Sequence, residues 1–202
     1  MEEKITYFEI PGGENTDETL RLVADRAKAR GINKILLAST RGDTARLAAD
    51  RFVSTGINMV VVPHQYGRRV EQRFPQELVS ELEQQGHRVH FSTMLFHTDD
   101  LYGMNVPSVM ATLLRTFCQG MKVCVEIILM ATDGGLIATG ERVIAVTGTG
   151  RGADTAVVAT AAPSTKLHEL HITEIICKPL ETKSRPIGSS PPVESVRPDS
   201  GR

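Results

Sequence analysis

Short apolar segments that alternate with amphipathic helical segments constrain this fold more than any other feature of the sequence. Lys34–Ala38 and Asn58–Val62 are apolar runs, and each follows a segment whose apolar residues repeat at helical spacing. This alternation is typical of βαβ units, whose crossovers are right-handed and whose sheets are mostly parallel. We therefore predict an α/β fold with a mostly parallel sheet. The other predicted strands are His87–Phe91, Arg142–Thr147, Thr155–Thr160 and Ile172–Cys177.

Residues typical of helix ends flank the helical segments. Asn15, with Glu18 three residues later, predicts a capping box, and Gly31 stands where the C-cap of that helix belongs. Asp43 is a candidate N-cap for a second helix, and Pro75 is a candidate first residue of a third. These signals place the helices between the predicted strands.

A longer helical region runs from Pro107 to about Leu136, and Gly120 divides it. Its second half, Met121–Met130, is apolar on nearly every side, which predicts a helix packed inside the protein. The strands that follow have no long helix between them, so we expect an antiparallel edge at that side of the sheet.

The last stretch of the chain differs in composition from the rest. Residues 178–202 hold five of the ten prolines, with serines between them. Such a segment buries too little apolar surface to offset the entropy of ordering it. We expect one domain over residues 1–178 and a flexible Pro/Ser-rich tail over residues 179–202.

Composition excludes several classes of protein. Lys and Arg total 23 against 24 Asp and Glu, a balance that argues against nucleic-acid or membrane-surface partners. The first residues resemble no signal peptide, and the apolar run Val123–Ala131 is far shorter than the ~20 residues that span a bilayer. Three cysteines without a CxxC pattern predict buried thiols in a cytoplasmic protein. His168 and His171 lack a third ligand, so we expect no metal site.

Two segments that follow predicted strands carry the groups that bind phosphate. Ala38–Ala45 and Thr147–Ala156 both combine hydroxyls, an arginine and glycine with a following Asp and Thr. Parallel sheets bind ligands beyond the carboxyl ends of their strands, and backbone N–H groups, hydroxyls and guanidinium groups bind phosphate. The candidate ligand-binding residues are Ser39, Thr40, Arg41, Gly42 and Thr44 in the first segment and Thr147, Gly148, Thr149, Gly150, Arg151 and Gly152 in the second.

Each of these features also has a purely structural interpretation. Either segment can be an ordinary turn with a solvated arginine. Gly148–Ala153 fits the dinucleotide pattern G-x-G-x-x-A only formally, because a strand rather than a helix is predicted to follow it. The basic loop His64–Arg69, with Arg73 beyond it, is either solvated or a ligand contact. Lys122 and Glu126 lie one helical turn apart, either as a buried ion pair or with Lys122 reaching a bound anion, so Lys122 is a further candidate.

Short specific motifs occur along most of residues 5–179. They are Tyr7-Phe8, Pro11-Gly12, Glu14-Asn15-Thr16, Ala38-Ser39-Thr40, His64, Tyr66-Gly67, Gln119-Gly120, Lys122-Val-Cys-Val-Glu126, Gly148-Thr-Gly-Arg-Gly-Ala-Asp-Thr-Ala156 and Cys177-Lys178-Pro179. In combination these motifs resemble the small archaeal and bacterial proteins classed with the C-terminal α/β domain of pyruvate kinase.

The resemblance implies a three-layer α/β/α fold with a mainly parallel central sheet. It implies no pyruvate kinase activity, because that reaction belongs to a barrel domain that this chain is too short to contain. The stand-alone members of the family are associated with FMN, so FMN is the cofactor that the resemblance favours. In pyruvate kinase a Ser/Thr-rich turn binds a phosphorylated regulator. Ser39, Thr40, Gly42 and Thr44 match that turn in character, whereas Asp43 departs from it because a carboxylate repels phosphate. The resemblance also implies self-association as a homo-oligomer.

These observations favour a nucleotide-binding protein that holds a small phosphorylated ligand, with FMN ahead of other ligands. The alternatives are a flavin-dependent enzyme of unknown substrate and a regulatory module that senses a phosphorylated metabolite. No acid–base dyad or activated nucleophile stands out, so we assign no catalytic residue. Because the chain has no Trp, aliphatic side chains and Tyr66 would have to cover a flavin ring.

Overall fold

Seven strands form one sheet in a computed structural model of the chain, which describes residues 2–98, 103 and 105–182. The strand order is β1-β7-β6-β5-β2-β3-β4. Five of the strands were predicted at or near their observed positions, while the predicted strand over His87–Phe91 shrinks to two residues. The strands are β1 (Thr6–Phe8), β2 (Lys34–Ala38), β3 (Asn58–Val62), β4 (Arg88–Val89), β5 (Arg142–Thr147), β6 (Thr155–Thr160) and β7 (His171–Pro179).

The sheet is mostly parallel, as the alternation of strands and helices predicts. β6 pairs antiparallel with both of its neighbours, β5 and β7, and every other pairing is parallel. Antiparallel pairing was expected at an edge of the sheet, but this position is wrong, because β6 lies inside the sheet. β7 returns beside β6, and the unpredicted strand β1 then pairs through Thr6 with Cys177 and forms the edge.

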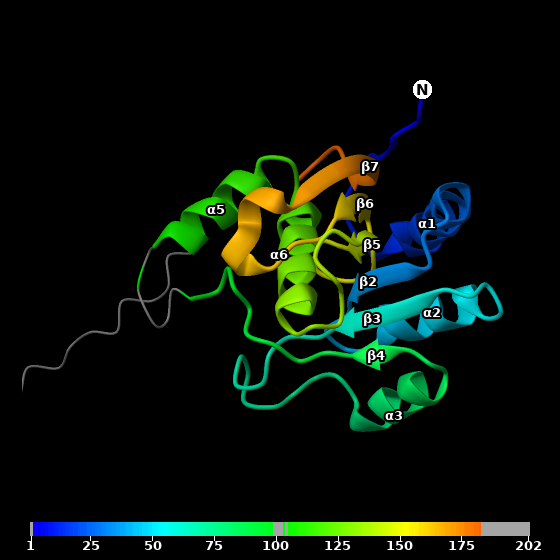
Figure 1. The fold of residues 1–202 in the computed structure, drawn as a ribbon, viewed down its shortest axis with the longest axis horizontal. Coiled ribbons are helices and arrows are strands. Elements are labelled where there is room, and N and C mark those ends of the chain that lie inside the picture. Colours follow the sequence, from blue (N-terminus) through cyan, green and yellow to red (C-terminus); the bar gives the residue numbers. More distant parts are fainter. Residues whose placement is uncertain (1, 99–102, 104, 183–202) are drawn as a thin grey trace, which may run out of the picture.

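Helices cover both faces of the sheet and complete three α/β/α layers (Figure 1). The helices α1 (Thr16–Arg30), α2 (Asp43–Phe52) and α3 (Gln76–Gln84) share one apolar core with one face of the sheet. The helix α6 (Gln119–Asp133) packs on the other face, and α5 (Val106–Arg115) lies against α6. Two short 3₁₀ turns, η1 (Gly13–Asn15) and η2 (Ser164–Glu169), complete the elements of the described residues.

The ends of α1 confirm one capping prediction and correct another. Gly31 ends the helix in the left-handed conformation at φ 62°, as predicted. Asn15 precedes the helix, but its side chain donates to the carbonyl of Ile10 at 2.9 Å and accepts nothing from α1. Glu18 pairs with Arg21 instead of reaching back to Asn15, so the predicted capping box does not form.

α6 is buried on almost every side, as its composition predicts. Gly120 lets it approach the sheet, because a Cβ at this position would lie 2.1 Å from the hydroxyl oxygen of Thr155 and 3.0 Å from that of Thr147. The predicted long helical region is divided just before Gly120, since α5 ends at Arg115 and α6 begins at Gln119. This close approach brings α6 to the carboxyl end of β5.

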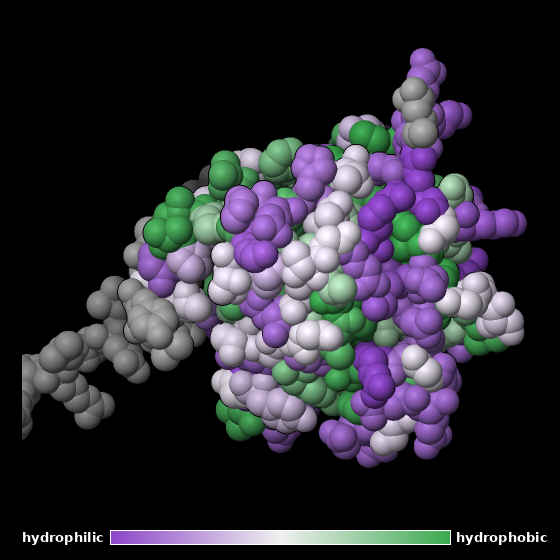
Figure 2. Space-filling view, viewed as in Figure 1, coloured by the Kyte–Doolittle hydropathy of each residue, from purple (hydrophilic) through white to green (hydrophobic). Residues whose placement is uncertain are grey.

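α5 exposes apolar side chains on its outer side, where Figure 2 shows hydrophobic residues. Val106, Val109 and Leu113 of α5 are all more than half exposed, and so is Phe117, which follows the helix.

None of the described helices is long and apolar enough to cross a membrane. The predicted tail lies mainly outside the described residues, and self-association and a cytoplasmic location stay predictions.

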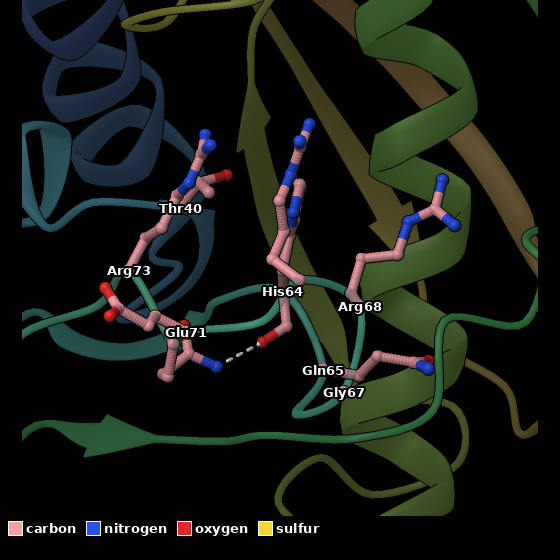
Figure 3. A pocket seen from close by; sticks show the side chains of 9 residues that line it. Thr40, His64, Gln65, Gly67, Arg68, Glu71 and Arg73 are labelled. Atoms are coloured by element: carbon pink, nitrogen blue, oxygen red, sulfur yellow. Dashed lines mark hydrogen bonds between the residues drawn. The ribbon is translucent and has the colours of Figure 1, made fainter.

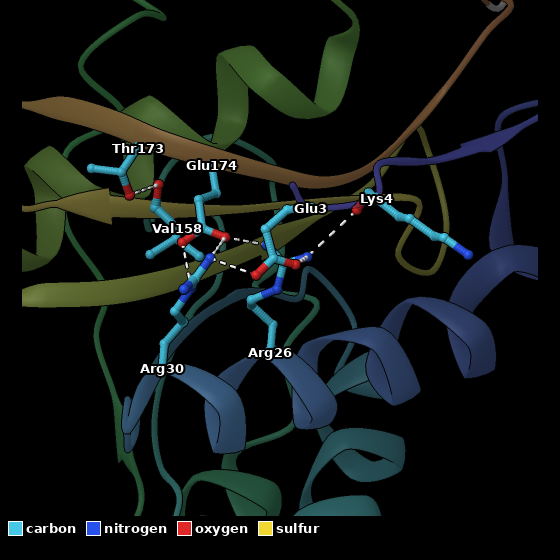
Figure 4. A network of polar contacts seen from close by, with 7 residues as sticks. All are labelled: Glu3, Lys4, Arg26, Arg30, Val158, Thr173 and Glu174. Carbon is cyan, nitrogen blue, oxygen red and sulfur yellow. Dashed lines mark hydrogen bonds and ion pairs between the residues drawn. The ribbon is translucent and has the colours of Figure 1, made fainter. Parts of the chain in front are cut away.

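A network of ion pairs fixes the end of α1 to β7 and to the amino-terminal segment (Figure 4). Arg26 and Arg30 both pair with Glu174 of β7, and Glu3 pairs with the same two arginines at 3.2 and 2.7 Å. Burial raises the pKa of Glu174, but the hydrogen bonds and positive charges of Arg30 and Arg26 outweigh it and hold this pKa below its usual value. The network therefore locks three separate segments together.

Candidate functional site

A cleft of about 930 Å³ opens at the carboxyl ends of β2, β3 and β5. β2 and β5 are parallel neighbours, but the chain leaves β2 toward α2 and β3 and leaves β5 toward β6 on the other side. The two outgoing loops therefore diverge and leave a crevice, which is where open α/β sheets bind ligands. Both predicted ligand-binding segments lie at this crevice. The predicted residues that line it are Ser39, Thr40, Arg41, Thr44, Gly148, Gly150, Arg151 and Gly152.

The first segment turns from β2 into the amino end of α2. The predicted N-cap role of Asp43 is wrong, because Gly42 at φ 91° takes that position and Asp43 is the first residue of the helix. The hydroxyl of Ser39 instead accepts a hydrogen bond from the backbone N–H of Ala45 at 3.3 Å. In the described part of the chain, no group accepts a hydrogen bond from the backbone N–H groups of residues 40–44. This end of α2 therefore offers donors and a partial positive charge to the cleft.

The second segment is a tight loop organised by the buried carboxylate of Asp154. This carboxylate accepts hydrogen bonds from the backbone N–H groups of Thr149 at 3.0 Å and Gly12 at 3.1 Å, and from the hydroxyl of Thr155 at 2.8 Å. Burial raises the pKa of Asp154, against the opposing effect of these hydrogen bonds. Gly148 is needed for close approach, since a Cβ there would lie 2.3 Å from a backbone oxygen. The loop is thus fixed in shape before any ligand binds.

The amino-terminal segment forms a further wall of the cleft that our sequence reasoning left out of the site. Pro11, Gly12, Gly13 and Glu14 line the cleft. Thr16 joins this segment to the second loop, because its hydroxyl donates to the carbonyl of Gly13 at 2.6 Å and accepts from the backbone N–H of Ala153 at 3.0 Å. The motif Pro11-Gly12, noted in the sequence, lies in this segment. The sequence contains no signal that this segment packs on residues 148–153.

Four arginines from three parts of the chain converge on the cleft. Arg41 and Arg151 come from the two predicted segments, and Arg69 and Arg73 come from the loop after β3. All four are exposed, and no ion pair or hydrogen bond joins their side chains to the rest of the described residues. In Figure 3 the side chain of Arg73 extends from this loop toward Thr40. The basic loop is therefore a wall of the cleft as well as a solvated segment.

α6 supplies the opposite wall, which is largely apolar. Val123, Ile127 and Met130 of α6 line the cleft together with Val62 and Met94. Tyr66 is absent from the lining and instead packs on Phe91, with 4.8 Å between the ring centroids. The cleft thus has a cationic side formed by loops and an apolar side formed by α6.

Four predicted ligand-binding residues do not line this cleft. Lys122 is fully buried, with its Nζ 2.5 Å from Glu126 Oε2, so the ion-pair interpretation is correct and Lys122 does not reach the cleft surface. The hydroxyl of Thr147 donates to the carbonyl of Gly120 at 2.8 Å. Gly42 packs against α3, and Thr149 is buried beside Asp154. These residues shape the cleft from behind its surface.

His97, which was not predicted from the sequence, joins the buried pair at the cleft. Glu126 lines the cleft, accepts from the backbone N–H of Phe96 at 2.8 Å and lies 3.3 Å from His97 Nδ1. Burial raises the pKa of Glu126, but the contacts with His97, Lys122 and Phe96 outweigh it and lower this pKa to about 2. Burial lowers the pKa of Lys122 against the opposing charge of Glu126. His64 also lines the cleft, and burial, His97 and Arg68 lower its pKa.

The described residues contain no cluster of side chains that could hold a metal ion. His168 lies in η2 and His171 begins β7, so they do not share a helix face. Cys118, Cys124 and Cys177 are free thiols and are buried, as predicted. Burial raises the pKa of Cys124 and Cys177, so neither is a reactive thiolate at neutral pH.

Comparison with known proteins gives a distant likeness to pyruvate kinases. No protein-family model matches the chain. A pyruvate kinase from Cryptosporidium parvum is 16% identical at a TM-score of 0.36, over 65% of this chain and 20% of that enzyme. A Cryptosporidium parvum pyruvate kinase in complex with ADP is 15% identical at a TM-score of 0.38, over 70% of this chain and 22% of that enzyme. The chain thus spans about a fifth of the length of these enzymes.

Proposed function

We propose that this protein binds a small phosphorylated ligand, with FMN as the favoured one, in the cleft at the carboxyl ends of β2 and β5. The observation that carries the proposal is the convergence of four arginines without an acidic partner among the described residues. Three carboxylates also line the cleft, but that of Glu126 is already paired with Lys122. A bound phosphate would supply the negative charge that the arginines lack.

The phosphate end of the ligand fits the cationic side of the cleft. The backbone N–H groups at the amino end of α2 and the guanidinium groups of Arg41 and Arg151 are the donors that a phosphate accepts from. The hydroxyl of Thr40 lies in the same wall. Because Asp154 and Thr16 already fix the second loop, little conformational entropy is lost when the ligand binds.

The rest of the ligand fits the apolar side. Val123, Ile127 and Met130 present aliphatic and thioether groups that pack well on a flat ring. Met94 and Val62 extend this surface. The sequence resemblance favours FMN, and a ring system joined to a phosphate by a flexible chain would span both sides. The proposal includes no pyruvate kinase activity.

Equilibrium titration of FMN and riboflavin, followed by flavin fluorescence, tests this function. We expect FMN to bind saturably and riboflavin, which lacks only the phosphate, to bind at least tenfold more weakly, since charge-assisted hydrogen bonds are each worth about 1.5–3 kcal/mol. Equal affinities would show that the arginines do not hold the phosphate. If FMN does not bind while sugar phosphates do, the flavin assignment fails and binding of a phosphorylated metabolite stands.

A further inference from the structure

His97 lies between a buried ammonium group and a buried carboxylate. Its Nδ1 is 3.2 Å from Lys122 Nζ and 3.3 Å from Glu126 Oε1. The Lys122 side chain is 0% exposed and that of Glu126 is 2% exposed, whereas that of His97 is 23% exposed and lines the cleft. His97 therefore connects the interior of the protein with the cleft.

The two contacts of Nδ1 require opposite protonation of the imidazole. An ammonium group only donates hydrogen bonds, so its contact needs an unprotonated Nδ1 and leaves the proton on Nε2. A carboxylate only accepts, so its contact needs a proton on Nδ1, and Nε2 of a neutral ring is then unprotonated. Both partners are within reach of the same nitrogen, and each selects one tautomer.

From this geometry we propose that His97 is a proton relay between Lys122 and a ligand in the cleft, which makes the cleft a site of acid–base chemistry as well as of binding. In the first state Lys122 donates to Nδ1, and Nε2–H faces the ligand. His97 then gives the Nε2 proton to a basic oxygen or nitrogen of the ligand and receives a proton from Lys122 at Nδ1. Lys122 becomes a neutral amine, His97 stays neutral, and its new Nδ1–H donates to Glu126.

The surroundings of His97 support this step. Nε2 has no hydrogen-bond partner among the described residues, so it is available to a ligand. Burial lowers the pKa of Lys122, which makes its proton easier to release, while the charge of Glu126 opposes that release. The other charged or titratable groups that act on the cluster are His64 and Arg68 from the loop after β3 and Arg115 from α5. None of them contacts Nδ1, so the tautomer depends on Lys122 and Glu126.

The relay also defines the ligand more closely, and this part rests on the proposed function. His97 lines the cleft together with Met94 and Ile127. A phosphate held by the arginines is already neutralised by their charge, so the group that exchanges a proton with His97 is another part of the ligand. We expect a phosphorylated molecule whose other end carries a carbonyl oxygen or a ring nitrogen.

Nitrogen-15 NMR of the histidine side chains in the full chain tests the relay without any ligand. At pH 7 we expect the Nε2–H tautomer of His97. Above the ordinary lysine pKa of about 10.4, where Lys122 has lost its proton, we expect the Nδ1–H tautomer that donates to Glu126. His97→Gln assigns the signal, and the exposed His168 serves as the reference that shows no such switch. The same His97 tautomer at both pH values would overturn the proposal.

Lys122→Met gives a second test at constant pH. The variant lacks the donor, so we expect the Nδ1–H tautomer already at pH 7. An unchanged Nε2–H tautomer would show that Lys122 does not determine the protonation of His97 and would overturn the relay. If this variant does not fold, the pH series of the unmodified protein decides alone.

Adding FMN then separates the proposed ligand from the proposed relay. A saturable shift of the Nε2 signal supports both, while no shift in a protein that shows the tautomer switch would contradict the proposed ligand but not the relay.

Discussion

Two groups of arginines lie at opposite ends of α1 and differ in what surrounds them. Arg26 and Arg30, in its last turns, are shielded and share the carboxylates of Glu174 and Glu3 (Figure 4). At the first turn of α1, where Thr16 contacts the second loop, the cleft gathers exposed arginines without a carboxylate partner in the described part of the protein. The first group holds segments together, and the second is available to an anion.

This difference shows why an arginine in a sequence says little about its role. A guanidinium group that already has carboxylate partners contributes to folding, because its charge is neutralised in the native state. Several such groups on one cleft without partners repel one another and add little to stability. Substitutions in the two groups should therefore change different measured quantities.

The largest effect should come from Glu126→Ala, which breaks the most deeply buried ion pair. Lys122 would keep a buried charge without its partner, and Phe96 N–H would lose its acceptor. We expect the free energy of unfolding to fall by about 3–5 kcal/mol, measured by urea denaturation. The double variant Lys122→Met with Glu126→Leu should recover most of this loss, because apolar residues then replace both charges. A loss below about 1 kcal/mol in the single variant would show that the pair is not important for folding.

The pH dependence of stability should follow from the same carboxylate. The pKa of Glu126 is about 2 in the folded protein, below its ordinary value of 4.5. Because this pKa is lowered, ionised Glu126 stabilises the folded protein. The stabilisation is fully present above pH 4.5 and is lost as the pH falls from there toward 2. Glu126→Gln should therefore lose less stability over this range than the unmodified protein. If the curves of unfolding free energy against pH run parallel for the two proteins, the lowered pKa of Glu126 is contradicted.

Arg151→Ala should change binding and not folding. We expect the Kd for FMN to rise roughly ten- to hundredfold. This rise corresponds to a loss of about 1.5–3 kcal/mol of binding free energy, as for a lost charge-assisted hydrogen bond. The free energy of unfolding should stay within about 0.5 kcal/mol of the unmodified value, since the residue is exposed. Arg142→Ala is the matched control, because Arg142 is also exposed but lies at the other end of β5. An unchanged Kd for Arg151→Ala would remove this residue from the site.

Glu174→Ala should give the reverse pattern. Removing the carboxylate takes from Arg26 and Arg30 a partner that both share, although Glu3 still pairs with each, and we expect the free energy of unfolding to fall by about 1–2 kcal/mol. The Kd for FMN should not change, because the network lies at the far end of α1 from the cleft. Glu18→Ala, which removes an exposed partner of Arg21, is the control and should have a smaller effect on unfolding. A change in the FMN Kd with Glu174→Ala would mean that the two ends of α1 are coupled.

The smallest effect should come from Asp43→Asn. Asp43 lines the cleft and is exposed, so its carboxylate repels a bound phosphate across solvent. We expect FMN to bind about 0.5 kcal/mol more tightly to this variant. Titration at low and high salt checks the cause, because screening by salt should remove the difference. Weaker binding would show that Asp43 supports the ligand instead of opposing it.

The sequence predicts elements well where local pattern determines them. Lys34–Ala38 and Asn58–Val62 are observed with their predicted bounds, because continuous apolar runs between helices leave few alternatives. The strand Thr6–Phe8 has only three residues and no pattern of its own, and it forms by pairing with β7. The interior place of β6 likewise depends on that distant pairing.

The site is predictable only in part, because it also depends on which distant segments become neighbours in the fold. The loops that hold Arg41 and Arg151 follow β2 and β5, so the rule on strand ends placed them together correctly. Arg69 and Arg73 resemble any solvated basic loop in the sequence, and their role depends on which loops are neighbours in space. His97 carries no motif, and its connection to Lys122 and Glu126 arises only when α6 packs beside it.

The central claim is that the arginines of the cleft bind the phosphate of FMN. The most direct test is the shift in thermal unfolding when FMN is added, measured for the unmodified chain and for one variant. In this variant glutamine replaces Arg41, Arg69, Arg73 and Arg151. Without FMN, the two proteins should be about equally stable, because the four side chains lack native partners in the described residues. At FMN concentrations about 100 times the Kd, only the unmodified protein should gain about 2.7 kcal/mol. An equal gain in both proteins, or a large loss of stability in the ligand-free variant, would contradict the account.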